Sequence, residues 1–198
     1  MAAARLKALG DLLDGCDTLI IEDDGVGDIA QTPPLSLGAR FPDRTIHMIS
    51  YSKTLGPDLR IAVLSASEAI IDQIQSYRSF SAGWTSRILQ GATAWLLRQE
   101  QTFEVIAAAR DAYQARRDGL AAAIRERGLS VPQGSGLCLW VPVASEPFAM
   151  VTLAARNIAV NPGSKFSVGA SGHIRVATAI LTDRAQEVAD AVALAHRP

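Results

Sequence analysis

Three short apolar runs, rich in β-branched residues, follow one helical pattern at the start of the sequence. The runs cover residues 18–21, 45–51 and 61–66, and charged residues or glycine and proline bound them. Residues 3–14 precede them with leucines at helical spacing, and Gly15 ends that pattern. A helix that leads into a strand is typical of a strand–helix–strand crossover. The first strand of that crossover is missing, so we expect a shortened or partial form of a larger α/β fold.

Hydrophobic patterns in the rest of the sequence predict more helices and a second group of strands. This order predicts an α/β portion over residues 1–102, a long linking helix over 103–130 and a small α+β domain over 131–198. We expect helices at residues 68–77, 85–101, 103–127, 148–156 and 183–196, and strands at 136–143, 157–160 and 173–179.

Composition excludes several classes of partner. The formal net charge is −1, from 19 basic and 20 acidic side chains, so the chain has no electrostatic footprint for DNA, RNA or an anionic membrane. No run is long and apolar enough to span a bilayer, and the first residues lack a secretory signal pattern. Cys16 and Cys138 show no metal or redox spacing, so we expect buried thiols, no metal site and a reducing cytoplasm.

The segment SYSKTLGPDLR, residues 50–60, joins two predicted strands and contains Lys53. An amine is a nucleophile in its deprotonated form, which burial or a neighbouring cation favours, and Arg60 is such a cation. Arginine and small hydroxyls such as Ser50 and Ser52 also suit a phosphate monoester. The alternative is a polar turn with no chemical role.

An acidic cluster ends the first predicted strand, and its Asp23 could pair with a protonated ring nitrogen. A lysine that forms a Schiff base, an acid for a pyridinium nitrogen and a phosphate clamp together describe a pyridoxal phosphate site. Each feature is common alone, and the combination is much rarer.

These segments resemble fold-type I pyridoxal phosphate enzymes, the aminotransferase class I/II superfamily. SYSKTLGPDLR is similar to their lysine segment, LIIEDD to the strand whose aspartate meets the pyridine nitrogen, and GHIRVATA to a C-terminal strand whose arginine binds a substrate carboxylate. YQARRDGLAAAI, GSGLCLWVPV and IAVNPGSKF fit in the same order. EDDGVGDIA and GWTSRILQ are most similar to the aminotransferase-like domain of MocR-type GntR regulators. The resemblance implies a partial transferase fold: the second half of the large mixed-sheet domain, then a small α+β domain.

The resemblance also implies site residues. Lys53 would form the Schiff base, and Asp23 would keep the pyridine nitrogen protonated. Arg175 would bind a carboxylate, and strand alternation places it on the face opposite Ile174 and Val176; the alternative is a solvated arginine on an edge strand. The cofactor phosphate would be held by Ser50, Arg60 and, more weakly, Ser52.

Three departures from the family pattern limit the resemblance. The family has a tyrosine or histidine two or three residues beyond the aspartate, where this chain has Gly25 and Val26. Asp58 adds a carboxylate close to the expected phosphate and would weaken its binding unless the side chain faces solvent. The family's N-terminal half, and the winged helix-turn-helix of a MocR regulator, have no counterpart here.

Three functions follow from the resemblance. The first is the pyridoxal phosphate-binding domain of a MocR-type regulator that senses an amino compound. The second is an aminotransferase that acts on an amino acid, and the third is an inert remnant without cofactor. The resemblance also implies a homodimer, and the near-neutral charge predicts no direct nucleic-acid binding.

The remaining notable residues receive structural interpretations. His47 lies in an apolar strand and is expected to be a core or edge residue rather than a ligand, and Glu22 and Asp24 are expected to be structural. We expect packing roles for Trp84, Trp95 and Trp140, surface positions for His173 and His196, and a solvated helix face for Arg116 and Arg117.

Overall fold

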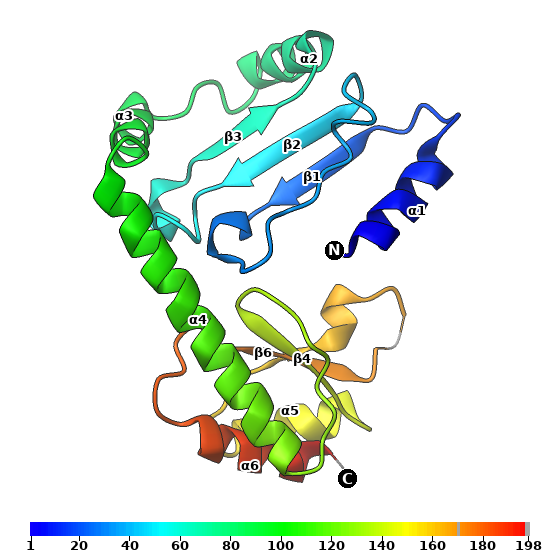
Figure 1. Ribbon diagram of the computed structural model, residues 1–198, viewed down its shortest axis with the longest axis vertical. Helices are drawn as coiled ribbons and strands as arrows, with labels where there is room; N and C mark the ends of the chain where they lie inside the picture. Colours follow the sequence, from blue (N-terminus) through cyan, green and yellow to red (C-terminus); the bar gives the residue numbers. More distant parts are fainter. Residues whose placement is uncertain (170, 197–198) are drawn as a thin grey trace. The chain divides into compact units, whose positions relative to one another are not determined.

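The computed structural model describes residues 1–169 and 171–196 (Figure 1). It divides into two compact units, residues 1–107 and residues 108–198. The helix α4 (Glu100–Glu126) contributes to both units. The functional division at residues 102 and 130 remains a prediction.

The first unit contains a sheet of three strands in the order β1-β2-β3. β1 and β2 are parallel, with Ile20 opposite Thr45, and β3 is antiparallel to β2, with Ser50 opposite Ala62. The elements are α1 (Ala3–Leu13), β1 (Ile20–Asp24), η1 (Gly27–Ile29), β2 (Thr45–Ser50), η2 (Pro57–Leu59), β3 (Ala62–Ser65), α2 (Glu68–Ser79) and α3 (Arg87–Leu96).

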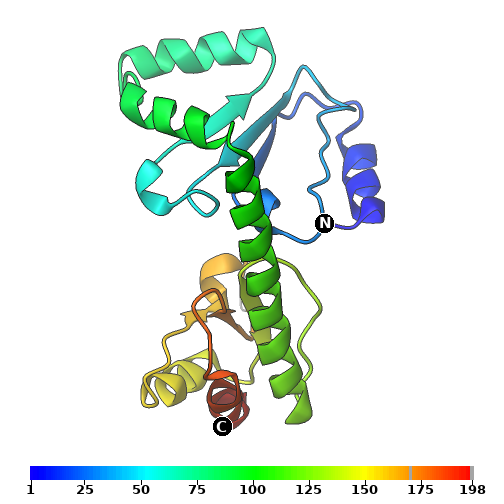
Figure 2. The same cartoon turned by 60° about the vertical axis from the view of Figure 1, so that its left-hand side comes forward.

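This topology brings two loops to one edge of the sheet, the loop after β1 and the loop that joins β2 to β3. The carboxyl ends of β1 and β2 lie at the same edge because the strands are parallel, and β3 begins there because it is antiparallel. Figures 1 and 2 show α1 beside β1, and α2 and α3 on the β3 side. The end of the sheet at which β1 and β2 finish therefore carries the loops that follow these two strands.

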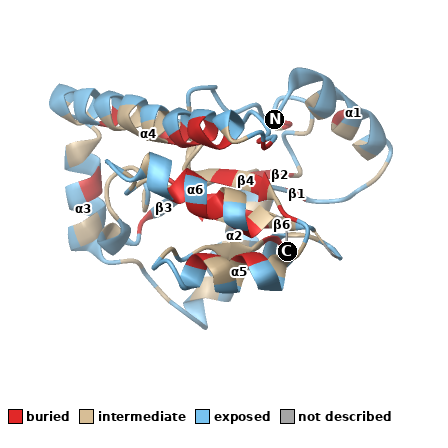
Figure 3. Ribbon diagram, turned by 90° about the horizontal axis from the view of Figure 1, so that it is seen from below, coloured by how far each residue is buried: buried red, intermediate tan, exposed pale blue. Residues whose placement is uncertain are grey.

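The second unit packs its helices against an antiparallel sheet of three strands in the order β4-β6-β5. Alternate residues of β4 and β6 face the core: Leu139 and Val141, with Ile174 and Val176. The buried positions, red in Figure 3, also lie on the helices, including Leu120, Ile124, Leu153 and Val192. The elements after α4 are β4 (Cys138–Pro142), α5 (Glu146–Ala154), β5 (Asn161–Pro162), η3 (Gly163–Phe166), β6 (His173–Ala177) and α6 (Ala185–His196).

Two predicted elements are wrong. The helix expected over residues 85–101 is interrupted, because Arg98 N–H bonds to the Trp95 carbonyl in a tightened last turn after α3. The strand expected over residues 157–160 is absent. Asn157 adopts φ 58°, and Ile158 N–H donates to the Leu153 carbonyl, so these residues form the turn that follows α5. The pairing with β6 begins only at residue 161.

Exposure corrects the predictions for the first unit. Trp84 is 86% exposed and Trp95 is 61% exposed, so neither has a packing role within the unit. Cys16, in the loop after α1, is only half-buried, and its Sγ donates to the Leu13 carbonyl. Hydrogen bonds from Thr18 lower the pKa of this thiol, and Arg44 makes a smaller contribution.

The second unit also differs from expectation in its cations and rings. Arg117 is buried and bonds to Asp118, and Arg116 donates to the Ala179 carbonyl, so neither lies on a solvated face. His173 and His196 are half-buried rather than surface residues; the first stacks on Trp140 and the second bonds to the Pro142 carbonyl. Cys138, on β4, is half-buried.

Among the described residues, no helix has both the length and the apolar character needed to cross a bilayer.

Candidate functional site

The loop after β1 is folded by the side chains that flank Asp23. The Asp24 carboxylate accepts a hydrogen bond from Gly27 N–H (2.6 Å) and turns the chain into η1. On the same face of the strand, Glu22 accepts from Leu37 N–H (2.7 Å) and anchors the following loop. Both residues are structural, as expected. Asp23 points to the opposite face and is exposed.

The loop after β2 forms a closed turn around the lysine. Leu55 N–H donates to the Tyr51 carbonyl (2.9 Å), and Tyr51 N–H donates to the Ile61 carbonyl (3.1 Å), which ties the turn to the start of β3. Within this turn the Ser50 hydroxyl donates to the Ser52 hydroxyl over 3.3 Å. Two hydroxyls therefore lie together immediately before Lys53.

The two loops meet at Lys53 and Gly25. A Cβ atom placed on Gly25 would lie 3.3 Å from Lys53 Nζ, which is a tight contact. The exposed amine of Lys53 therefore lies over the backbone that directly follows Asp23 and Asp24. Because glycine has no side chain, the Lys53 amine can lie close to the backbone at position 25.

Tyr51, in the loop after β2, lies close enough to Asp28, in the segment after β1, for the charge of Asp28 to affect its phenol. Its ring is half-buried, and burial raises the pKa of its phenol; the charge of Asp28 in η1 raises it further. Tyr51 was not among the site residues predicted from the sequence, although its position between Ser50 and Ser52 was a usable signal.

The predicted phosphate arginine lies at the far end of the turn. Arg60 is exposed and adopts φ 49°, a left-handed conformation that is uncommon for a residue with a side chain. Within the described part of the chain it makes no hydrogen bond to Ser50 or Ser52. Asp58 on η2 is exposed. Its carboxylate faces solvent, so the weakening of phosphate binding that its charge could cause is not expected.

Arg175 lies in the second unit, in the middle of a row across the sheet. It is directly opposite Trp140 on β4 and Asn161 on β5. Its guanidinium lies 4.5 Å from the centre of the Phe166 ring, and Phe166 meets Trp140 edge-to-face at 6.3 Å. Its Nε atom is buried and has no hydrogen-bond partner among the described residues. Arg175 therefore lies against the Phe166 ring, with an Nε–H donor that no described residue uses.

Sequence reasoning missed the aromatic neighbours of Arg175. Alternation along β4 and β6 could have placed Trp140 and Arg175 on one face, given the register. Phe166 could not be found in this way, because it lies on η3 outside the strands.

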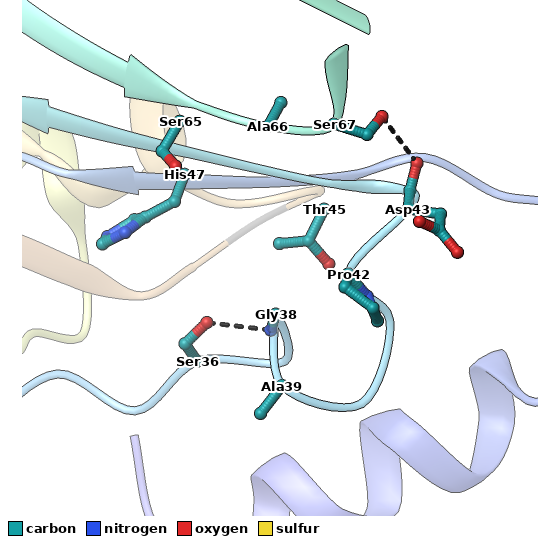
Figure 4. Close-up of a pocket in the computed structure, with 10 residues that line it drawn as sticks. All are labelled: Ser36, Gly38, Ala39, Pro42, Asp43, Thr45, His47, Ser65, Ala66 and Ser67. Carbon is teal, nitrogen blue, oxygen red and sulfur yellow. Dashed lines mark hydrogen bonds between the residues drawn. The ribbon is translucent and has the colours of Figure 1, made fainter. Parts of the chain in front are cut away.

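A polar cavity of about 480 Å³ lies at the opposite edge of the first sheet (Figure 4). Half-buried His47 lines it together with Thr45 and Ser65, and the Ser67 hydroxyl closes one side through a bond to the Asp43 carbonyl. None of the predicted site residues lines this cavity. Within the described ranges, no group of three or more histidine, cysteine or acidic side chains could hold a metal ion.

Comparison with known proteins identifies the family. The chain is 28% identical to the vitamin B6 salvage pathway transcriptional repressor PtsJ of Salmonella typhimurium, over 92% of this chain and 43% of PtsJ. It is 25% identical to aromatic-amino-acid aminotransferase 2 of Thermococcus litoralis, over 93% of this chain and 50% of that protein. The chain thus spans about half the length of these relatives.

The fold is the mixed α/β fold of the aminotransferases. The aromatic aminotransferase of Pyrococcus horikoshii OT3 superposes with a TM-score of 0.89 at 20% identity, over 98% of this chain and 55% of that structure. The model of the aminotransferase class I and II family matches residues 20–192. The chain therefore belongs to the aminotransferase class I and II family.

Proposed function

We propose that this chain is the pyridoxal phosphate-binding, aminotransferase-like domain of a MocR-type GntR regulator, with Lys53 as the covalent anchor. Members of the family typically bind pyridoxal phosphate. The observation that carries the proposal is the Lys53 amine above Gly25, at the sheet edge shared by the loops after β1 and β2.

The residues at this edge fit the chemistry of the cofactor. The paired hydroxyls of Ser50 and Ser52, with Arg60 on the same turn, would hold its phosphate. Asp23, exposed on β1, would hold a proton on the ring nitrogen. When bound, the cofactor supplies an electron sink for the amino compound. Lys53 would accept or return a proton at its Nζ atom. In the second unit, and not at this edge, Arg175 would bind the carboxylate of an amino compound.

Two observations favour a regulator over an enzyme. Gly25 supplies no phenol or imidazole beside the Lys53 amine, so one hydrogen-bond donor used by the enzymes is absent. PtsJ, HTH-type regulator TauR of Rhodobacter capsulatus and HTH-type regulator YisV of Bacillus subtilis are regulators by name, and this chain is 28–31% identical to them. Aminotransferase activity remains the alternative, since aminotransferases match this chain at 25–29% identity, a range that overlaps that of the regulators.

Covalent labelling tests the proposal. The chain is mixed with pyridoxal phosphate and reduced with borohydride, and peptides are analysed for a pyridoxyl mass. We expect saturable labelling at Lys53 that Lys53→Ala removes. Lys7 and Lys165, the other two lysines of the sequence, report random labelling. Equal labelling of all three lysines would favour the inert remnant.

A second assay separates the regulator from the enzyme. The loaded chain is incubated with an amino acid and an acceptor 2-oxo acid, 2-oxoglutarate, and the oxo acid formed from the amino acid is quantified. A regulator binds an amino compound and releases at most one oxo acid per chain. Repeated turnover would favour the aminotransferase.

We also propose that the chain forms a homodimer. Ile88 is 83% exposed and Trp95 is 61% exposed, and they lie seven residues apart on one face of α3. We expect sedimentation velocity to show a dimer that Ile88→Glu weakens. A monomeric parent chain would contradict this proposal.

A further inference from the structure

Glu146 connects three segments of the second unit. It is the first residue of α5, and its carboxylate accepts hydrogen bonds from the Ser171 hydroxyl (2.5 Å), Ser164 N–H (3.2 Å) and His173 N–H (3.5 Å). Ser164 lies in η3, and His173 begins β6. One side chain therefore fixes the start of a helix, of a 3-10 turn and of a strand.

The charge of Glu146 is part of this link. The hydrogen bonds, that from Ser171 first and those from Ser164 next, hold the pKa of this carboxyl at about 2. Glu146 is therefore ionised at neutral pH, and charge-assisted hydrogen bonds are stronger than neutral ones.

Gly163 holds the same turn by close packing. A Cβ atom at this position would lie 2.2 Å from the Ser171 hydroxyl, 2.6 Å from the His173 carbonyl oxygen and 3.0 Å from the Trp140 ring. Only glycine fits without movement of the backbone. The turn is thus held at two successive residues, Gly163 and Ser164, before it reaches Phe166.

Phe166 transmits this placement to the arginine. Its ring lies against the Arg175 guanidinium at 4.5 Å, and its contact with Trp140 limits sideways movement. With one face of the guanidinium covered, the arginine presents its N–H edge to a ligand. A planar edge of this kind matches a carboxylate.

We propose that Glu146 is a positioning residue for Arg175. By fixing η3 it keeps Phe166 against the guanidinium and so orients the arginine toward a carboxylate ligand. The inference rests on the proposed function, in which Arg175 binds the carboxylate of an amino compound. Glu146 itself does not touch that ligand.

Fluorescence of Trp140 provides the test. The substitutions Trp84→Phe and Trp95→Phe leave Trp140 as the only tryptophan of the three, beside Arg175 in the sheet. This parent is titrated with 3-phenylpropionate, and with 3-phenylpropan-1-ol to measure binding of the ring alone. We expect a fluorescence change that depends on the carboxylate and is lost in Arg175→Met.

Two variants test the role of Glu146. In Glu146→Gln we expect binding to weaken about tenfold, because a neutral amide holds η3 less firmly than a carboxylate and the arginine loses part of its fixed orientation. Gly163→Ala disturbs the same turn without a change in charge and should weaken binding in the same direction. The matched control is Glu187→Gln, which removes a paired carboxylate from α6 of the same unit and should leave the affinity unchanged. Thermal midpoints are recorded for every variant.

The outcomes distinguish this inference from the proposed function. Unchanged affinity in Glu146→Gln, with binding lost in Arg175→Met, would overturn the positioning role and leave the role of Arg175 intact. Absence of carboxylate-dependent binding in the parent would overturn the positioning role of Glu146 and also the proposed role of Arg175 in binding a carboxylate. Pyridoxyl labelling of Lys53 should be equal in Glu146→Gln and the parent, because the lysine turn lies in the first unit.

Discussion

The second unit encloses its sheet, whereas the first unit leaves much of its apolar surface exposed. In the second unit Ile174 and Val141 are fully buried between the sheet and the helices. In the first unit Ile21 is 64% exposed and Val63 is 49% exposed, although both lie in strands. The buried apolar area that stabilises a fold is thus concentrated in the second unit.

The candidate binding residues follow the same contrast. Arg175 is held by Phe166 and by neighbours in two strands, so its place is fixed before a ligand arrives. Lys53 and Arg60 are exposed on a turn. Ordering exposed side chains costs binding free energy, whereas a fixed arginine is already organised. Under the proposed function, the second unit would supply a preformed contact to the ligand and the first unit an adaptable one.

Hydrogen exchange of the full chain should show the largest contrast. Local opening requires less free energy where few apolar contacts must break. We expect amides of β4, β6 and α6 to exchange most slowly, and amides of β1 and β3 to exchange much faster. Equal protection in both sheets would contradict the contrast.

Core substitutions should sharpen the comparison. Leu153→Ala removes a fully buried side chain from α5 and should lower the free energy of unfolding of the second unit by about 2–5 kcal/mol. Ile21→Ala, on the exposed face of β1, should lower the free energy of unfolding of the first unit by less than about 0.5 kcal/mol. Urea unfolding followed by circular dichroism measures both, and similar costs would show that the first sheet is better covered than its exposure indicates.

A glycine pair tests how tightly the second unit is packed. Gly163→Ala forces a Cβ atom against the His173 carbonyl and should destabilise the unit by about 1–3 kcal/mol. Gly134→Ala is the matched control, because a Cβ atom there meets nothing within 4 Å. Urea midpoints compare the two variants with the parent. Equal midpoints would mean that the turn at Gly163 shifts without cost.

Sequence patterns predicted most elements of both units because their signals are local. Short apolar runs predicted the strands around Lys53 and Arg175. The helix α5 begins at Glu146, directly after Ser145, whose side chain accepts from Phe148 N–H as an N-cap. The errors arose where one residue decides the backbone. Asn157, in a left-handed conformation, moved the start of β5 to Asn161.

The candidate site was predictable where topology follows from the order of strands. Parallel strands bring their carboxyl ends to one edge, so Asp23 at the end of β1 and Lys53 in the loop after β2 could be expected at the same edge. The support of Arg175 was not predictable. Glu146 and Ser171 are 25 residues apart, and Phe166 reaches the arginine from a turn, so no local pattern encodes either contact.

The pH dependence of stability should give the smallest effect, and it also comes from the second unit. The folded pKa of Glu146 is about 2, against an ordinary value of 4.5. The unfolded chain therefore binds the proton first as the pH falls, and the contribution of Glu146, complete above pH 4.5, is lost between about pH 4.5 and 2. Glu187 and Asp190 have lowered pKa values as well, so the difference between the parent and Glu146→Gln isolates one carboxyl. We expect the urea midpoint to fall less between pH 7 and pH 3 in Glu146→Gln than in the parent or in Glu104→Gln, an exposed control. An identical fall in all three would mean that the hydrogen bonds of Glu146 do not stabilise the second unit.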